Sequence, residues 1–207
     1  MKHITRLMAV ACLLGTAAAI AAAPDAPLKL PVNERGELQR PTDYREWVFL
    51  NSALGLTYGP NRSRPGEAPR FSNVFVNPAA YRAFQQTGQW PDGTFFVLEV
   101  RASEQPAAAT AGSSTQASRL AVEAAVRDSS RFPGEGWAYV SFSERGQLRE
   151  SAAPLARSAS CYACHEAHGA VQWTFTQFYA EAFDRAKQLG TVRRDYDAQR
   201  KIGDTPH

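Results

Sequence analysis

The sequence contains few sulfur-bearing residues. Its 207 residues include three cysteines and two methionines. Both methionines, Met1 and Met8, and one cysteine, Cys12, lie at the very start of the chain. Beyond them only one pair of cysteines is left, Cys161 and Cys164. A framework of several structural disulfides is therefore excluded.

A long hydrophobic run is also absent. The apolar stretch 7–20 is shorter than the roughly 20 residues that span a bilayer. It follows the basic residues Lys2 and Arg6 and ends in small residues, a pattern typical of a secretory signal peptide. We predict a signal peptide over residues 1–21, cleaved near Ala21. The mature protein would be periplasmic and have no membrane anchor.

No charge of one sign dominates the mature chain. Without residues 1–21 it holds 21 lysines and arginines against 20 aspartates and glutamates. It has no basic run and no internal repeat, so we predict no nucleic-acid partner. The remaining 186 residues suit one domain with its own core.

What the chain does have is a short stretch, residues 161–165, that reads CYACH. With His168 it could form a zinc site, although structural zinc sites usually join two ligand clusters across a spacer. It could also be a redox dithiol, although that motif usually comes early in a thioredoxin-like domain. The third interpretation is one covalently bound haem c. Cysteines three apart would bond the haem, and His165 would be the proximal iron ligand. Haem c explains every position of the motif and agrees with export, so we favour it.

A second strong iron ligand is difficult to find. The mature chain has no methionine, and its only other histidines are His168 and His207. We expect His168 to be solvated and His207 to lie in a frayed terminus. The prediction is a five-coordinate haem with an open side, which argues against a simple electron-transfer cytochrome.

The hydrophobic patterns predict an α+β fold. Residues 22–40 form a flexible lead-in, 41–190 the haem domain and 191–207 a charged tail. Segment 47–58 is strand or helix. We predict strands over residues 72–76, 93–103, 120–126 and 137–142, and a helix over residues 78–86. Residues 59–70 and 104–116 are predicted loops.

Two helix starts are predicted from capping patterns. Asp43 and Glu46 have the spacing of a capping box. Thr174 and Gln177 have the same spacing, before an amphipathic helix that ends at Gly190. The resulting picture is an antiparallel β-sheet with flanking helices and a C-terminal haem-attachment helix.

In order, the chain contains ERGELQRPTDYREWV, NVFVNPAAYRAFQQTGQWPDGT, VEAAVRDSSRF with GWAYVSF, and CYACHEAHGAVQWTFTQFYAEAF. With these segments it resembles the cytochrome P-460 and cytochrome c′-beta family. The resemblance implies an antiparallel sheet with helices, a homodimer and a five-coordinate c-type haem. Cytochromes P-460 oxidise hydroxylamine and process nitric oxide with a lysine cross-linked to the haem. Their c′-beta relatives lack that bond and bind nitric oxide or carbon monoxide on an apolar distal face.

The lysine position of the family corresponds here to Leu98, and no lysine occurs between Lys29 and Lys187. The chain is therefore closer to the c′-beta type. Strand alternation places Phe96 on the same face as Leu98, so both would line the distal side. Phe49 is a weaker candidate for the same cap. Glu123 matches a distal carboxylate of cytochromes P-460, where it would relay protons; the alternative is a solvated, outward-facing acid.

We therefore predict an exported cytochrome that binds nitric oxide or another small diatomic ligand such as carbon monoxide. One alternative is a hydroxylamine or nitric oxide oxidoreductase, or a peroxidase. The other is an electron-transfer cytochrome c with its own electron-transfer partner.

Overall fold

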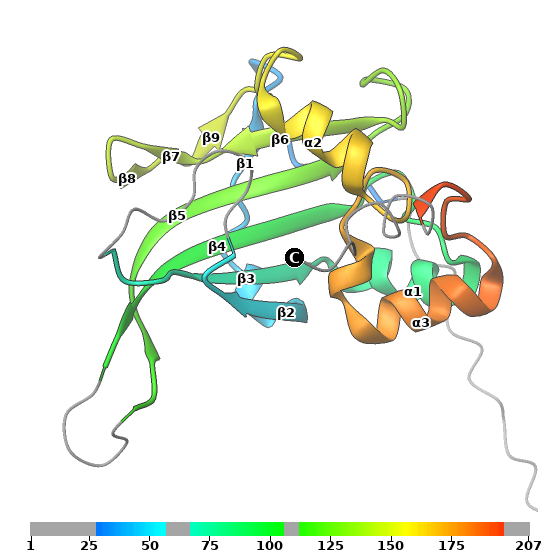
Figure 1. Ribbon diagram of the computed structural model, residues 1–207. Coiled ribbons are helices and arrows are strands. Elements are labelled where there is room, and N and C mark those ends of the chain that lie inside the picture. The colour runs from blue at the N-terminus through cyan, green and yellow to red at the C-terminus, as the bar shows by residue number, and fades with distance from the viewer. Residues whose placement is uncertain (1–27, 57–66, 106–111, 197–207) are drawn as a thin grey trace, which may run out of the picture.

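The computed structural model describes residues 28–56, 67–105 and 112–196. Its centre is a five-stranded antiparallel sheet in the order β2-β3-β4-β5-β6, so each strand pairs with its neighbours along the chain (Figure 1). The strands are β2 (Val48–Leu54), β3 (Phe71–Val76), β4 (Phe95–Glu104), β5 (Thr115–Arg127) and β6 (Trp137–Ser141). The predicted antiparallel sheet with helices is confirmed, and the undecided segment 47–58 contains strand β2.

Three α-helices and two single turns complete the architecture of the described residues. The helices are α1 (Pro78–Thr87), α2 (Ser160–His168) and α3 (Ala180–Leu189), and the 3-10 turns are η1 (Tyr44–Glu46) and η2 (Thr176–Phe178). The minor strands are β1 (Leu38–Gln39), β7 (Ser143–Glu144), β8 (Gln147–Leu148) and β9 (Ser151–Ala152). In the described ranges, no helix is long and apolar enough to cross a membrane.

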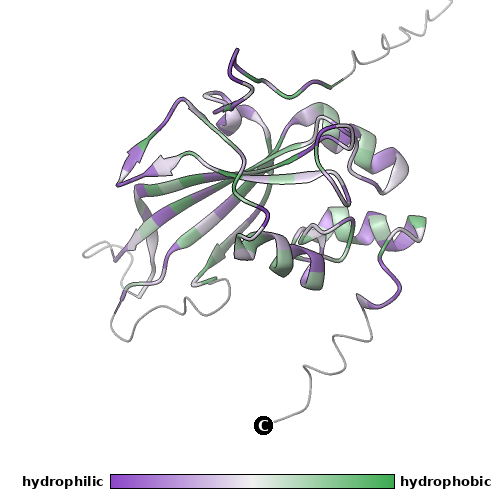
Figure 2. Cartoon of the chain, turned by 90° about the horizontal axis from the view of Figure 1, so that it is seen from above, coloured by the Kyte–Doolittle hydropathy of each residue, from purple (hydrophilic) through white to green (hydrophobic). Residues whose placement is uncertain are grey.

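The sheet has two differently covered faces. The first, which we call the helix-covered face, carries Val76, Phe96 and Tyr139, and helices α1, α2 and α3 pack on it. The second, the opposite face, carries Val97 and Val122 and is covered by the N-terminal segment and the residues around β7–β9. Hydrophobic and hydrophilic bands alternate along the strands because successive side chains point to opposite faces (Figure 2).

The described part of the lead-in, residues 28–40, is tied to the domain. Strand β1 pairs with β9, and Leu38 is fully buried in the core of the opposite face. Burial of this apolar side chain stabilises the packed arrangement of the segment. Residues 28–40 therefore differ from the predicted flexible lead-in. The signal peptide over 1–21 lies outside the described residues.

Both predicted capping boxes are wrong. Asp43 makes no cap; its carboxylate accepts a hydrogen bond from Trp47 Nε1 at 3.3 Å, and only the turn η1 follows it. The chain cannot continue as a helix there because Tyr44 is drawn into the opposite face and β2 starts at Val48.

At the second site, Thr174 donates to the carbonyl of Val171 at 2.6 Å. The Gln177 side chain bonds the backbone of His168 and Ala170. Helix α3 therefore begins only at Ala180. It does end, as predicted, at Gly190 in the left-handed conformation.

Candidate functional site

Helix α2 presents Cys161, Cys164 and His165 together. Residues three and four apart on an α-helix share one face, so the two sulfur atoms and the imidazole project from the same side. Cys161 packs against the core of the helix-covered face. The motif predicted from the sequence is thus assembled by a single local element.

Both cysteines are free thiols and half-buried. Burial raises the pKa of the Cys161 thiol, with a further contribution from the nearby Glu123 carboxylate, and burial also raises the pKa of Cys164. Reactive C-x-x-C dithiols have a lowered pKa instead. The arrangement therefore does not favour the redox-dithiol interpretation. The zinc interpretation also lacks support, because no group of three or more His, Cys, Asp or Glu side chains within 28–56, 67–105 and 112–196 could hold a metal ion.

A hydrogen bond determines the tautomer of His165. Its Nδ1 lies 2.8 Å from the backbone carbonyl oxygen of Trp173, and a carbonyl can only accept. Nδ1 therefore carries the proton, and the lone pair of a neutral ring is left on Nε2. Burial lowers the pKa of His165 to about 4, against the smaller opposite effect of that hydrogen bond, so the ring is neutral at physiological pH. A neutral imidazole with a hydrogen-bonded Nδ1 is the usual form of a metal-ligating histidine.

The acceptor carbonyl belongs to an unusual turn. Gln172 and Trp173 both have positive φ, 44° and 59°, between the bridged residues Val171 and Thr174. Each residue other than glycine in this left-handed conformation costs about 1–2 kcal/mol of conformational free energy. The Gln172 side chain helps to hold the turn by accepting a hydrogen bond from the backbone N–H of Trp90 at 2.6 Å. The turn aims the Trp173 carbonyl at His165.

Gly169 allows this turn to lie against the end of α2. A Cβ atom at Gly169 would come within 2.4 Å of the Trp173 carbonyl carbon. Only glycine tolerates that approach, since no side chain could shift to relieve a clash with backbone.

Tyr139 is a site residue that sequence reasoning missed. Its ring centroid is 4.4 Å from that of His165, and the Phe175 ring is also 4.4 Å from His165. The side chain is only 5 % exposed, and within the described ranges its hydroxyl has no hydrogen-bond partner. Burial raises the pKa of this phenol, so the hydroxyl stays protonated. Alternation along the predicted strand 137–142 could have identified its face, but not its position beside the histidine.

Leu98 and Glu123 are direct neighbours on the sheet. The register pairs Val74 with Leu98 and Leu98 with Glu123, all on the helix-covered face. Leu98 is half-buried, and the Glu123 side chain remains exposed on the side of Cys161. Surrounding protein atoms nevertheless raise the pKa of the Glu123 carboxyl. The acid thus lies on the same face as the cysteines, although it is still open to solvent.

Phe96 also lies on this face but belongs to its core. The ring is 5 % exposed and packs edge-on against Trp90, with centroids 4.8 Å apart. Trp137 and Tyr179 complete its surroundings. Of the two predicted distal residues, Leu98 is therefore the more accessible.

The structure corrects the assignment of Phe49. Its ring contacts Phe75 at 5.6 Å, and Phe75 belongs to the core of the opposite face. Phe49 pairs with Phe75 in the β2–β3 register, and paired residues point to the same side. Phe49 is therefore not grouped with Phe96 and Leu98; it lies at the edge of the sheet, 55 % exposed.

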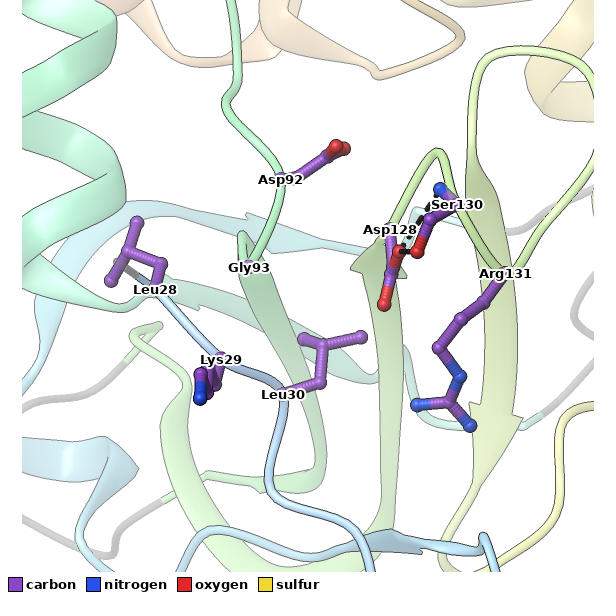
Figure 3. A pocket seen from close by; sticks show the side chains of 8 residues that line it. All are labelled: Leu28, Lys29, Leu30, Asp92, Gly93, Asp128, Ser130 and Arg131. Carbon is purple, nitrogen blue, oxygen red and sulfur yellow. Dashed lines mark hydrogen bonds between the residues drawn. The ribbon is translucent and has the colours of Figure 1, made fainter. Parts of the chain in front are cut away.

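A separate hollow lies where β4 begins and β5 ends, lined by Leu28, Lys29, Asp92, Asp128 and other residues (Figure 3). Its acidic groups already have partners: Asp92 accepts from Arg127, and Asp128 accepts from Ser130. None of the cysteine, histidine or tyrosine side chains described above lines this hollow. It is not part of the candidate site.

Comparison with known proteins agrees with this geometry. Residues 41–176 match the Cytochrome P460 family, which is well over half of the chain. The chain belongs to the cytochrome P460 family. No curated protein matches it.

Membership of the cytochrome P460 family implies a c-type haem, and the residues fit that group. Cys161 and Cys164 are unpaired thiols on one helical face, and His165 has its Nε2 lone pair available. The buried Tyr139 hydroxyl, which has no partner among the residues that the structure describes, is a further sign, since buried polar groups are nearly always hydrogen-bonded. All of these groups come from the helix-covered face and the helix above it.

Proposed function

We propose that the protein is an exported c-type cytochrome of the c′-beta type, which binds nitric oxide or another small diatomic gas such as carbon monoxide at a five-coordinate haem. The observation that carries this proposal is the hydrogen bond from His165 Nδ1 to the Trp173 carbonyl. It leaves Nε2 as the ligand atom, on the same helical face as the two cysteines.

Three residues of α2 would hold the haem. The Cys161 and Cys164 thiols would carry its two thioether bonds, and each bond forms by addition of S–H across a vinyl group, so no oxidant is needed. His165 would ligate the iron through Nε2, and its hydrogen bond to the Trp173 carbonyl orients the ring. When bound, the haem would supply an iron atom to which a small gas can bind.

The residues on the sheet support an apolar gas site. Leu98 is half-buried on the helix-covered face and offers no ligand atom. No methionine occurs after Met8, and His168 is exposed. An apolar surface excludes water and admits small neutral molecules, so nitric oxide and carbon monoxide are the ligand class that fits it best.

The test is optical and EPR spectroscopy of purified holo-protein, with and without nitric oxide. We expect a high-spin, five-coordinate spectrum that changes when the gas is added. A low-spin, six-coordinate spectrum that ignores the gas would contradict the proposal. The double variant C161S/C164S should release its haem into acidified acetone, which wild-type protein should not.

The second candidate function is oxidation of hydroxylamine or nitric oxide, or peroxidase activity. The raised pKa of Glu123 supports it, because an acid whose pKa is raised by desolvation is a candidate proton-transfer group. Leu98 at the position of the lysine cross-link argues against it. Mass spectrometry of the haem peptide distinguishes the two: a third covalent link would favour the enzyme.

An electron-transfer cytochrome is the third candidate. It needs a sixth ligand, and His207, the last residue, lies outside the described ranges. A low-spin wild-type spectrum that became high-spin in the H207A variant would support this candidate, together with an electron-transfer partner.

Export and assembly are parts of the same proposal. The mature chain would begin near Ala22, in the periplasm, and intact-mass measurement of the exported protein tests this. A homodimer is consistent with strand β2, which lies at one edge of the sheet and exposes Phe49 and Leu54. Edge strands with exposed apolar residues favour pairing with another chain. Light scattering during gel filtration would measure the mass in solution.

A further inference from the structure

The segment after α3 returns to the helix that carries the cysteine and histidine motif. Figure 1 draws it in red beside the loop that follows α2, and the backbone N–H of Arg193 donates to the carbonyl of Ala170 at 2.9 Å. Thr191 anchors the segment on its other side by donating to the Gly88 carbonyl at 2.8 Å. This segment lies beyond residue 176, where the match to the cytochrome P460 family ends.

The guanidinium of Arg193 covers the carboxyl end of α2. Nη1 donates to the carbonyl of Glu166 at 2.6 Å and to that of Gly169 at 3.3 Å, and Nη2 donates to the carbonyl of Ala167 at 3.1 Å. Asp195 holds the guanidinium from its other edge, at 2.7 and 2.8 Å. The side chain is only 21 % exposed, so these bonds are shielded from water.

These contacts complete the hydrogen bonding of the helix end. The last four carbonyls of an α-helix have no partner within the helix. In α2, His165 receives the N–H of Gly169, and His168 receives the Gln177 side chain. The other two carbonyls, of Glu166 and Ala167, are bound by Arg193. A positive charge at this end also interacts favourably with the helix dipole.

The helix end is mechanically connected to the proximal histidine. Gly169 donates to the carbonyl of His165 at 2.9 Å and lies directly against the backbone of Trp173. The Trp173 carbonyl in turn accepts from His165 Nδ1. Fraying of α2 at Glu166 to Gly169 would therefore change the distance between the histidine ring and its acceptor.

From these contacts we infer that Arg193 is a positioning residue for the iron ligand His165. It keeps the end of α2 closed, and the closed end holds His165 in the orientation that its bond to Trp173 requires. This inference rests on the proposed five-coordinate haem. The inference adds to the site a residue that lies outside the family match. It also gives a role in ligand geometry to residue 193, which belongs to the predicted charged tail.

The test compares R193Q with the matched control R194Q in ferrous holo-protein. Arg194 is the next residue and is exposed, so R194Q removes the same charge without touching α2. We expect R193Q, but not R194Q, to shift the iron–histidine stretching band in the Raman spectrum to lower frequency. Backbone amides of residues 166–171 should exchange with deuterium at least about tenfold faster, since bonds from a charged donor are lost. R193K should lie between the two, because lysine keeps the charge but cannot reach all three carbonyls.

The outcomes separate the inference from the proposed function. A wild-type spectrum without the iron–histidine band contradicts the five-coordinate proposal. If that band is present but does not move in R193Q, Arg193 does not position the histidine, whether or not the amides exchange faster. If R193Q does not accumulate as holo-protein, D195N tests the same contact by freeing the guanidinium from its carboxylate. A smaller shift in the same direction is then expected, and an unchanged band overturns the inference.

Discussion

Two carboxylates on neighbouring strands show how differently the two faces of the sheet are built. Glu99 on β4 is completely buried in the opposite face, whereas Glu123 on β5 is exposed on the helix-covered face. Burial pushes the pKa of Glu99 upward, but hydrogen bonds from Tyr44 and Arg45 outweigh it, and the net pKa is lowered. Glu123 has no such partners in residues 28–56, 67–105 and 112–196, and desolvation raises its pKa. Partners, rather than exposure, decide the direction in which each pKa moves.

The opposite face is a structural region, whereas the helix-covered face holds the groups suited to chemistry. On the opposite face, Glu99 accepts hydrogen bonds from Tyr44 at 2.5 Å and from Arg45 at 2.6 and 2.7 Å. Its negative charge is therefore stabilised by partners within the protein. On the helix-covered face, the Tyr139 hydroxyl lacks a protein partner within the described residues and Glu123 has only desolvation acting on it. Groups with shifted pKa values and without hydrogen-bond partners cluster at functional sites, which agrees with a cofactor bound on the helix-covered face.

The largest effect that would test this contrast is expected for E99Q. The substitution leaves Arg45 and Tyr44 facing a neutral amide in a buried position, and we expect the free energy of unfolding to fall by about 3 kcal/mol. Urea unfolding followed by circular dichroism measures it. The matched variant E123Q should change stability by no more than about 0.5 kcal/mol. Equal effects of the two substitutions would refute the contrast.

A pair of tyrosines gives the next largest effect. Y44F removes a hydrogen bond to the charged Glu99 and should cost about 2 kcal/mol. Y139F removes a hydroxyl that has no partner in the described part of the chain, so the stability of the haem-free protein should stay within about 0.5 kcal/mol. The same unfolding assay on haem-free and haem-loaded protein measures the loss of stability in each variant. A loss in Y139F that appears only with haem would identify the cofactor as the missing partner.

The pH dependence of stability should differ in sign for the two acids. Because the folded-state pKa of Glu99 is lowered, its contribution is present above its unfolded pKa of about 4.3 and is lost as pH falls through the folded value. The folded-state pKa of Glu123 is raised, so its contribution is present below about 4.3 and is lost as pH rises through the folded value. Melting temperatures of wild type, E99Q and E123Q measured across the acidic and neutral range should therefore show opposite changes in slope.

The smallest expected effect concerns the haem itself. If Glu123 lies near the iron, reduction should be coupled to its protonation, and the reduction potential of wild-type holo-protein should fall as pH rises. The slope should be less than the roughly 59 mV per pH unit of a fully coupled proton. Potentiometric titration at several pH values should show a flatter line for E123Q. Identical slopes in wild type and E123Q would remove Glu123 from the site.

Predictions from the sequence were most accurate where the signal is local. The strand 72–76 and the helix 78–86 correspond to β3 and α1, because alternation and a terminal glycine act over a few residues. The capping patterns failed because Asp43 and Thr174 each have a competing hydrogen-bond partner within four residues, Trp47 and Val171, which the capping-box spacing does not reveal.

Side-chain faces were harder to predict than elements. Phe96 and Leu98 share a face because they are two residues apart on one strand. Phe49 is on a different strand, and its face depends on the register with β3, which also contains an irregularity between Phe49 and Asn51. Register is set by pairing across the sheet, so no pattern within residues 47–58 determines it.

The sequence by itself determined the chemistry of α2: two thiols and an imidazole on one helical face, in a chain without methionine after Met8. That information is contained in spacing and composition, which act within one turn of helix. Only the tertiary structure decided that Trp173 sets the tautomer of His165, that Tyr139 lies beside the ring and that Arg193 closes the helix. These contacts join residues that are distant in sequence or lie in strained turns, and they exist only once the sheet and helices have packed together.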